Sequence, residues 1–223
     1  MRKIPYREAV GALMYCAVAT RPDIAFPTAL FSQFVENPGP AHWEAVKHIF
    51  QYLLGTKTLE LIYGETDGGL EGYTDTDGAT QEHRHAISGY AFLIDGGAVL
   101  WFSKKQEIVT LSTAEAEYVA ATHATKEAIW LKHFLSEVFQ PINKPIPLYC
   151  DSQSAIALTQ DRSHHTRTKH IDIRYHFIRY VVQDGKIKII YCPTDEMVVD
   201  ILTKPLPSLK AKHFARALGL ASP

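Results

Sequence analysis

The sequence lacks the features that define several large classes of protein. Only three of its 223 residues are cysteines, Cys16, Cys150 and Cys192, and none has the spacing of a disulfide framework or a zinc site. Its 23 basic and 24 acidic side chains exclude a uniformly basic nucleic-acid binder, although a local basic stretch could still meet phosphates. No apolar run approaches the roughly 18 residues of a membrane span, and the first residues do not form a signal peptide. We therefore expect a soluble, intracellular protein without a membrane partner.

Apolar residues recur at helical spacing in the first quarter of the chain and predict a small helical bundle. Pro22 suits the first position of the second helix, because a proline there loses no helical hydrogen bond. A short strand-like run and the turn-rich stretch 64–69 end this unit. We therefore predict a helical segment, 1–66, and a second domain, 67–223. The three predicted helices span residues 6–20, 22–34 and 41–54.

From residue 70 onward the pattern changes to strands. Asp95-Gly96-Gly97 separates two strand-like runs and favours a hairpin, because these residues tolerate positive φ. We predict an α/β fold with a mixed α+β sheet: three antiparallel strands, then strand–helix units whose helices cover the sheet. The predicted strands are residues 70–76, 88–94, 98–102, 147–150 and 186–192, and the predicted helices are residues 113–138, a helix from Ser152, residues 169–183 and further helices at the end.

Two glutamates at the start of the long helix compete for a chemical role. Ser112 and Glu115 have the S-x-x-E spacing of a capping box, which is a sufficient structural explanation of Glu115. Glu117 lies one turn before an apolar stripe, so its carboxylate is predicted to point at the sheet. A buried acid is costly unless it is paired, protonated or bound to a cation. The stripe comprises Ala120, Ala124, Ala128, Leu131, Leu135 and Val138.

Three aspartates could join Glu117. Asp75 lies near the end of the first strand, Asp151 follows a later strand as a helix begins, and Asp200 lies early in a helix after a strand. Taken alone, Asp151 reads as a helix N-cap and Asp200 as a solvated helix acid, and Asp77 competes with Asp75. Taken together, the carboxylates suit Mg²⁺, and two ions about 4 Å apart can clamp the attacking and leaving oxygens of a phosphodiester.

Several motifs carry a resemblance to a known family. They are Tyr73-Thr-Asp75, Ser88-Gly89-Tyr90, Trp101 with Ser103-Lys104-Lys105-Gln106, Thr113-Ala-Glu-Ala-Glu117-Tyr-Val-Ala120, Leu148-Tyr-Cys-Asp151-Ser-Gln-Ser-Ala, Arg167-Thr-Lys-His170 onward to His176, and Pro193 through Asp200 to Leu206. Over roughly residues 70–220 they resemble the ribonuclease H domain of copia-type LTR-retrotransposon Pol polyproteins. The helical segment, with Thr20-Arg21-Pro22-Asp23-Ile24, looks like the region after the reverse-transcriptase palm, the thumb or connection, of the same polyproteins.

This resemblance implies a ribonuclease-H-like fold in which Asp75, Glu117, Asp151 and Asp200 are the catalytic acids and metal ligands. It implies two Mg²⁺ ions, for which Mn²⁺ can substitute, and an RNA/DNA hybrid whose RNA strand is cut. The second acid of the family motif stands three residues before an alanine, which again selects Glu117 over Glu115. The polymerase part of the polyprotein is a further expected partner.

The sequence also departs from the family pattern. No Tyr-x-Asp-Asp strand of a polymerase palm occurs in the chain, so we expect no DNA synthesis from it. Asp77-Gly78-Ala79 stands where related sequences have Asp-Trp-Ala, and Val199 replaces an alanine before the last acid. Neither change removes a metal ligand.

Histidines and basic residues are weaker candidates for the site. The loop histidines His164 and His165, or His170 at the next helix, could assist proton transfer or product release, because imidazole changes charge near neutral pH. Solvated loop positions are the alternative. A local basic excess could hold phosphates without reading sequence, whereas the solvated face of a helix is the simpler explanation. The candidates for this contact are Lys104, Lys105, Arg167, Lys169 and Arg174.

The sequence thus predicts a metal-dependent endoribonuclease that hydrolyses the RNA strand of RNA/DNA hybrids and belongs to a retrotransposon polyprotein. A catalytically idle remnant or domesticated fragment, which binds nucleic acid or a polyprotein partner, is the alternative. The absent polymerase palm favours that alternative, and the complete set of acids opposes it. A transposase or integrase of the same fold is disfavoured, because the final acid is an aspartate in the nuclease-like motif after Pro193-Thr194.

Overall fold

A five-stranded mixed sheet organises the computed structural model, which describes residues 4–64, 69–77, 85–110, 112–139, 141–160 and 172–222. Its strand order is β4-β3-β2-β5-β6. The first three strands are antiparallel, whereas β5 runs parallel to β2 and β6 parallel to β5. The predicted antiparallel strands followed by strand–helix units are therefore confirmed. The strands are β2 (Glu71–Asp77), β3 (Ile87–Ile94), β4 (Gly97–Lys105), β5 (Ile146–Cys150) and β6 (Ile187–Tyr191).

The hairpin between β3 and β4 has the predicted turn chemistry. Asp95 and Gly96 both have positive φ, 50° and 83°. Two consecutive residues of this kind give a turn whose twist matches that of the flanking strands. The turn therefore sets the register of the adjoining pairs, Ile94 with Gly97 and Leu93 with Ala98. A β-bulge between Phe92 and Leu93 shifts the pairs beyond it, which include Gly89 with Ser103.

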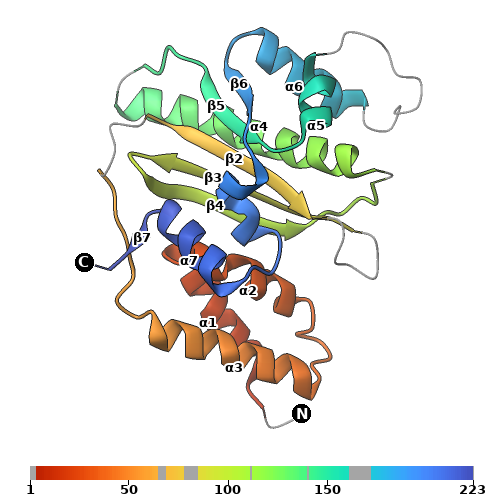
Figure 1. Ribbon diagram of the computed structural model, residues 1–223. Coiled ribbons are helices and arrows are strands. Elements are labelled where there is room, and N and C mark those ends of the chain that lie inside the picture. The colour runs from red at the N-terminus through yellow and green to blue at the C-terminus, as the bar shows by residue number, and fades with distance from the viewer. Residues whose placement is uncertain are drawn as a thin grey trace.

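Helices α4 (Thr113–Val138), α5 (Gln153–Gln160) and α6 (Asp172–Gln183) cover one face of the sheet (Figure 1). The small side chains of Ala120, Ala124 and Ala128 are fully buried, so α4 lies close against the strands. The prediction was wrong for Val138, which is 55% exposed. Helix α4 has 26 residues and is about 39 Å long, whereas a nine-residue strand spans about 30 Å, so its last turn extends beyond the sheet.

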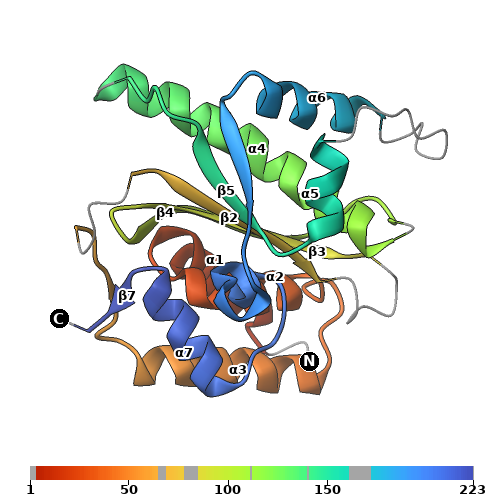
Figure 2. The ribbon, with the colours of Figure 1, turned by 45° about the horizontal axis from the view of Figure 1, so that its top comes forward.

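The remaining helices cover the opposite face (Figure 2). One hydrophobic core joins the helical segment, through Leu13 and Val46, to Ala91 of the sheet and to Leu202 and Phe214 near the chain end. No described helix is both long and apolar enough to cross a membrane. A domain boundary at residues 66–67 stays a prediction. These helices are α1 (Tyr6–Ala19), η1 (Pro22–Ile24), α2 (Ala25–Ser32), α3 (Pro40–Gly55), η2 (Thr194–Glu196), η3 (Val198–Leu202) and α7 (Ser208–Ala217).

A small second sheet links distant parts of the chain. Strand β1 (Glu60–Leu61) pairs antiparallel with β7 (Leu220–Ala221). The strand predicted after α3 is therefore present but only two residues long. Its partner has no counterpart among the predicted elements.

A buried ion pair ties η1 to α3. The guanidinium of Arg21 contacts the carboxylate of Asp23 at 2.7 Å, and both side chains are buried. Tyr52 donates its hydroxyl to Asp23 Oδ2 at 2.6 Å. Arg21 Nη2 donates to Thr56 Oγ1 at 2.7 Å, so the network spans the turn and the end of α3. Burial and the Asp23 charge raise the pKa of Tyr52 well above its ordinary value, which keeps this hydroxyl a donor.

Candidate metal centre

Asp75 is placed by the close approach of η3 to the sheet. It lies in β2, is 2% exposed and pairs with Gly89 of β3. A Cβ at Gly89 would lie 2.6 Å from Thr203 Cγ2 and 3.0 Å from Leu202 Cβ, so only glycine leaves room for this segment. From there Thr203 donates its hydroxyl to Asp75 Oδ2. The glycine of the Ser88-Gly89-Tyr90 motif therefore positions a carboxylate on the neighbouring strand.

Replacing Gly89 with alanine should destabilise the protein by about 1–3 kcal/mol, because the added methyl group must displace Leu202 and Thr203. The free energy of unfolding in urea measures this cost. Gly11→Ala is the matched control, since nothing lies within 4 Å of a Cβ at Gly11 in α1. The control should stabilise the protein by about 0.5–1 kcal/mol, as alanine favours helix over glycine. Equal effects of the two substitutions would contradict the packing described for η3.

Glu117 lies in the second turn of α4 and is 8% exposed. Its Oε2 atom is buried and has no hydrogen-bond partner in the described part of the chain. Burial, and then the charges of Asp75 and Asp151, raise the pKa of Glu117 to about 10, against the opposing effects of the Thr76 backbone and Lys204. This carboxyl group therefore stays protonated at neutral pH until a cation approaches it.

Glu115 has the structural position predicted for it. Ser112 precedes α4, and its Oγ accepts a hydrogen bond from the Glu115 backbone N–H at 3.2 Å. The serine half of the predicted capping box is therefore present. Both glutamates are buried, so burial alone does not separate them. The charges of Asp75 and Asp151 act on Glu117 and raise its pKa.

Asp151 follows the last residue of β5. Thr194 donates its hydroxyl to Asp151 Oδ2 at 2.9 Å. The N-cap prediction for Asp151 was wrong, because Ser152 Oγ accepts from the Ala155 N–H at 3.2 Å and caps α5 instead. The Asp151 carboxylate is thus available to the site.

Glu117, Asp151 and Cys150 form a group whose possible ligand atoms lie within 4.8 Å of one another. Burial raises the pKa of the Cys150 thiol well above its ordinary value, so the thiol stays protonated. Hard cations such as Mg²⁺ prefer oxygen ligands. The two carboxylates, rather than the sulfur, are therefore the atoms suited to such an ion.

Asp200 lies in η3, a 3₁₀ helix rather than the predicted α-helix, and its carboxylate is almost fully buried. Lys204 Nζ lies 2.8 Å from Asp200 Oδ1 and 3.7 Å from Asp75 Oδ2. Lys210 Nζ lies 3.3 Å from Asp200 Oδ2. Both lysines and Thr203 were not predicted as site residues, although the i,i+4 spacing of Asp200 and Lys204 is a recognisable ion-pair signal.

The four acids come from β2, α4, the end of β5 and η3, and their charges influence one another. Burial raises the pKa of Asp75 to about 6; Lys204 and Thr203 oppose the rise, and Asp200 and Asp151 add to it. Buried carboxylates of like charge need a compensating cation. With the unpartnered Glu117 oxygen, this all-oxygen cluster fits a hard divalent ion.

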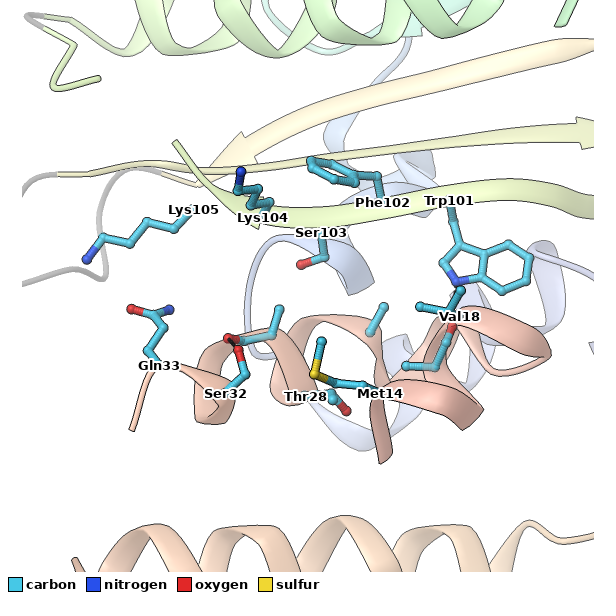
Figure 3. Close-up of a pocket in the computed structure, with 13 residues that line it drawn as sticks. Met14, Val18, Thr28, Ser32, Gln33, Trp101, Phe102, Ser103, Lys104 and Lys105 are labelled. Atoms are coloured by element: carbon cyan, nitrogen blue, oxygen red, sulfur yellow. Dashed lines mark hydrogen bonds between the residues drawn. The ribbon is translucent and has the colours of Figure 1, made fainter. Parts of the chain in front are cut away.

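Lys104 and Lys105 end β4 at the same end of the sheet as Asp75. Lys104 pairs with exposed Glu107 at 2.8 Å. Both lysines border a groove of about 470 Å³ between β4 and helices α1 and α2. Lys105 extends toward the side of Gln33, whereas Lys104 points away from the helices (Figure 3). At the other end of the groove, Trp101 Nε1 donates to the Ala17 carbonyl at 2.7 Å and fixes α1 to β4.

The remaining predicted residues are not placed by the structure. Arg167, Lys169, His164, His165 and His170 lie outside the described residues. Arg174 belongs to α6, for which only the backbone is described at this position.

The sheet and its covering helices define a ribonuclease-H-like fold. A structure of a foamy viral protease–reverse transcriptase with double-stranded DNA is similar to 91% of this chain and 32% of that one, with a TM-score of 0.55 and 15% identity. A ribonuclease H1 solved in complex with an RNA/DNA hybrid matches 60% of this chain and 93% of that one, with a TM-score of 0.46 and 15% identity.

The chain is homologous to a segment of retrovirus-related Pol polyproteins of transposons. It is 49% identical over 223 residues to the Pol polyprotein from transposon TNT 1-94 of Nicotiana tabacum, and 35% identical over 218 residues to that from transposon RE2 of Arabidopsis thaliana. It spans only 17% and 15% of their lengths. A secreted RxLR effector protein of Plasmopara viticola is 47% identical over 133 residues, which are 59% of this chain and 94% of that protein. No family model matches the sequence.

Proposed function

We propose that the chain is a ribonuclease H of a retrotransposon polyprotein, which hydrolyses the RNA strand of an RNA/DNA hybrid with divalent metal. Two observations carry this proposal: Glu117 and Asp151 have possible ligand atoms within 4.8 Å, and Lys204 bridges Asp75 and Asp200. A buried Glu117 oxygen has no partner among the described residues. Homology to Pol polyproteins supports it. Two bound Mg²⁺ ions, or Mn²⁺ in their place, would activate water for attack and stabilise the leaving 3′-oxygen.

Two of the acids would bind metal in an orientation that neighbouring hydroxyl groups fix. Thr203 holds Asp75 and Thr194 holds Asp151, each through a hydroxyl that donates to one carboxylate oxygen. The other oxygen of Asp151 is left for a ligand, and the partial exposure of this residue gives access from solvent. Such outer hydrogen bonds orient ligands and tune their basicity.

The hybrid would lie across the end of the sheet that carries Asp75. Lys104 and Lys105 end the strand two places away, about 10 Å across the sheet, and would contact phosphates there. Arg167, Lys169 and Arg174 are proposed phosphate contacts. Proton transfer or product release is proposed for His164, His165 or His170.

The proposed partners are the RNA/DNA hybrid and the polymerase part of the polyprotein, inside the cell. The segment 1–66 is proposed to correspond to the thumb or connection and 67–223 to the nuclease. No polymerase active-site motif occurs in the sequence, so DNA synthesis is not part of the proposal.

Cleavage of a labelled RNA/DNA hybrid by the purified chain tests the proposal. We expect Mg²⁺- or Mn²⁺-dependent cutting of the RNA strand to products with 5′-phosphates, and no cutting of single-stranded RNA or in EDTA. Asp151→Asn should lower kcat/KM at least about 100-fold, because even groups behind metal ligands contribute 10–100-fold. Folded, metal-supplied protein that leaves the hybrid intact would contradict the proposal.

A second candidate is a binding protein without catalysis. The 47% identity to a protein named as an effector favours this alternative. Binding of the hybrid without cutting, unchanged in Asp151→Asn, would identify it. The same labelled hybrid serves both measurements, so one preparation separates the two candidates.

A further inference from the structure

The ammonium group of Lys204 lies between two of the four acids. Its Nζ atom contacts Asp200 Oδ1 at 2.8 Å and Asp75 Oδ2 at 3.7 Å, and its side chain is three-quarters buried. Lys210 contacts Asp200 through the other oxygen, at 3.3 Å, and does not bridge to Asp75 in the described contacts. Lys204 is therefore the lysine that joins the two acids.

The four acids form two pairs, which differ in whether a lysine ammonium group contacts them. Asp75 and Asp200 share the Lys204 ammonium, whereas Glu117 keeps an unpartnered buried oxygen near Asp151 in the described structure. A metal ion shared by Asp75 and Asp200 would need oxygen ligands at about 2.1 Å and would meet the ammonium group at close range. Two cations at that distance repel strongly, because little water separates them.

The lysine also has space into which it can move. Lys204 lines a hollow of about 620 Å³ between α3 and α7, which Tyr52, Leu206 and Lys212 also line. An extended lysine stem packs readily along apolar walls while its charged group reaches solvent. Withdrawal into this hollow would free both carboxylates without unfolding η3.

We propose that Lys204 is an internal cation that bridges Asp75 and Asp200 in the metal-free protein and competes with a divalent ion for them. This inference rests on the proposed function, because it assumes that the acids bind metal. Of two ions, the one on the Glu117–Asp151 side meets no ammonium group in the described contacts. The ion shared by Asp75 and Asp200 binds more weakly than it would without the lysine, since it must displace that group.

Titration of the full chain with Mn²⁺ tests this inference. Binding is measured by calorimetry and by the paramagnetic resonance signal of the free Mn²⁺. Lys204→Met should tighten the weaker binding event about tenfold, the size of a typical coupling between two ligands. Hybrid cleavage by this variant should also saturate at a lower metal concentration. Lys204→Gln provides a second substitution, and circular dichroism confirms that each variant is folded.

Substitutions of two other lysines distinguish the effect of a bridging cation from a general effect of removing positive charge. Lys210→Met removes the same charge from a lysine that contacts Asp200 and Asp195. Lys212→Met removes it from the wall of the same hollow. Lys212→Met should change Mn²⁺ affinity less than about threefold, and Lys210→Met should tighten binding less than Lys204→Met does. Unchanged affinity in the Lys204 variants, or an equal gain in Lys210→Met, would overturn the inference.

The outcomes also separate this inference from the proposed function. Wild-type protein that neither binds Mn²⁺ nor cuts the hybrid would overturn both. Wild-type protein that binds and cuts, with Lys204 variants of unchanged affinity, would overturn the bridging cation alone.

Discussion

Replacing Glu117 with glutamine should abolish hybrid cleavage, with kcat/KM reduced at least about 100-fold at saturating Mg²⁺. The amide keeps the shape of the side chain but cannot supply a negatively charged oxygen to the ion. Glu115→Gln is the matched control two residues away, and it should retain activity within about threefold of wild type, because the cap is made by the Glu115 backbone N–H. Loss of activity in both variants, or in Glu115→Gln alone, would show that the second acid is misassigned.

The same substitution should change the pH dependence of stability in the absence of metal. Folding raises the pKa of Glu117 to about 10, whereas an unfolded glutamate titrates near about 4.3. Between these values the folded state holds a proton that the unfolded state has lost, so stability falls as pH rises. Glutamine cannot ionise, so Glu117→Gln should be the more stable protein, and increasingly so from about pH 5 to pH 9.

Thermal unfolding of both proteins in EDTA across this pH range measures the effect, with Glu115→Gln as the control. Addition of Mg²⁺ at pH 8 should raise the melting temperature of wild type more than that of Glu117→Gln, because a ligand stabilises only the state that binds it. Parallel pH profiles for wild type and Glu117→Gln would contradict the burial of an ionisable group there.

Replacing Asp23 with alanine should destabilise the protein by about 3–5 kcal/mol, because the buried guanidinium of Arg21 would lose its partner. Tyr52 would also lose its acceptor. Urea unfolding followed by circular dichroism gives the free energy directly. Glu44→Ala is the control, since its 2.7 Å pair with Lys47 is exposed, at 60% and 44%, and should contribute less than about 1 kcal/mol. If Asp23→Ala lowers the free energy of unfolding no more than the control does, water must reach the Arg21 network.

Local sequence patterns were sufficient for most of the secondary structure. The bounds of α4, residues 113–138, were predicted without error, because Ser112 is a strong start signal and an alanine-rich stripe follows. The β3–β4 hairpin followed from Asp95-Gly96, whose conformational preference is local. Both depend on neighbours within a few residues along the chain.

Tertiary contacts set the features that the sequence analysis missed. Strand β7 forms only because a partner 161 positions earlier reaches it, as Glu60 pairs with Ala221. Ser152, rather than Asp151, caps α5, a choice between neighbouring residues that spacing does not decide. The approach of Thr203 to Asp75 depends on Gly89, 114 positions before it, so no local pattern reveals that hydrogen bond.

The single core beneath the sheet limits how related transposons can exchange parts of this coding region by recombination. Val46 of α3, Ile24 of η1 and Leu202 of η3 are members of that core, and Leu202 lies two residues after Asp200. A crossover between α3 and β2 would combine helices α1 to α3 from one transposon with η3 from another. The surfaces of these helices and of η3 that meet in the core would then no longer match. We therefore expect crossovers between α3 and β2 to be inherited rarely, and the helical segment to diverge together with η3, which carries Asp200.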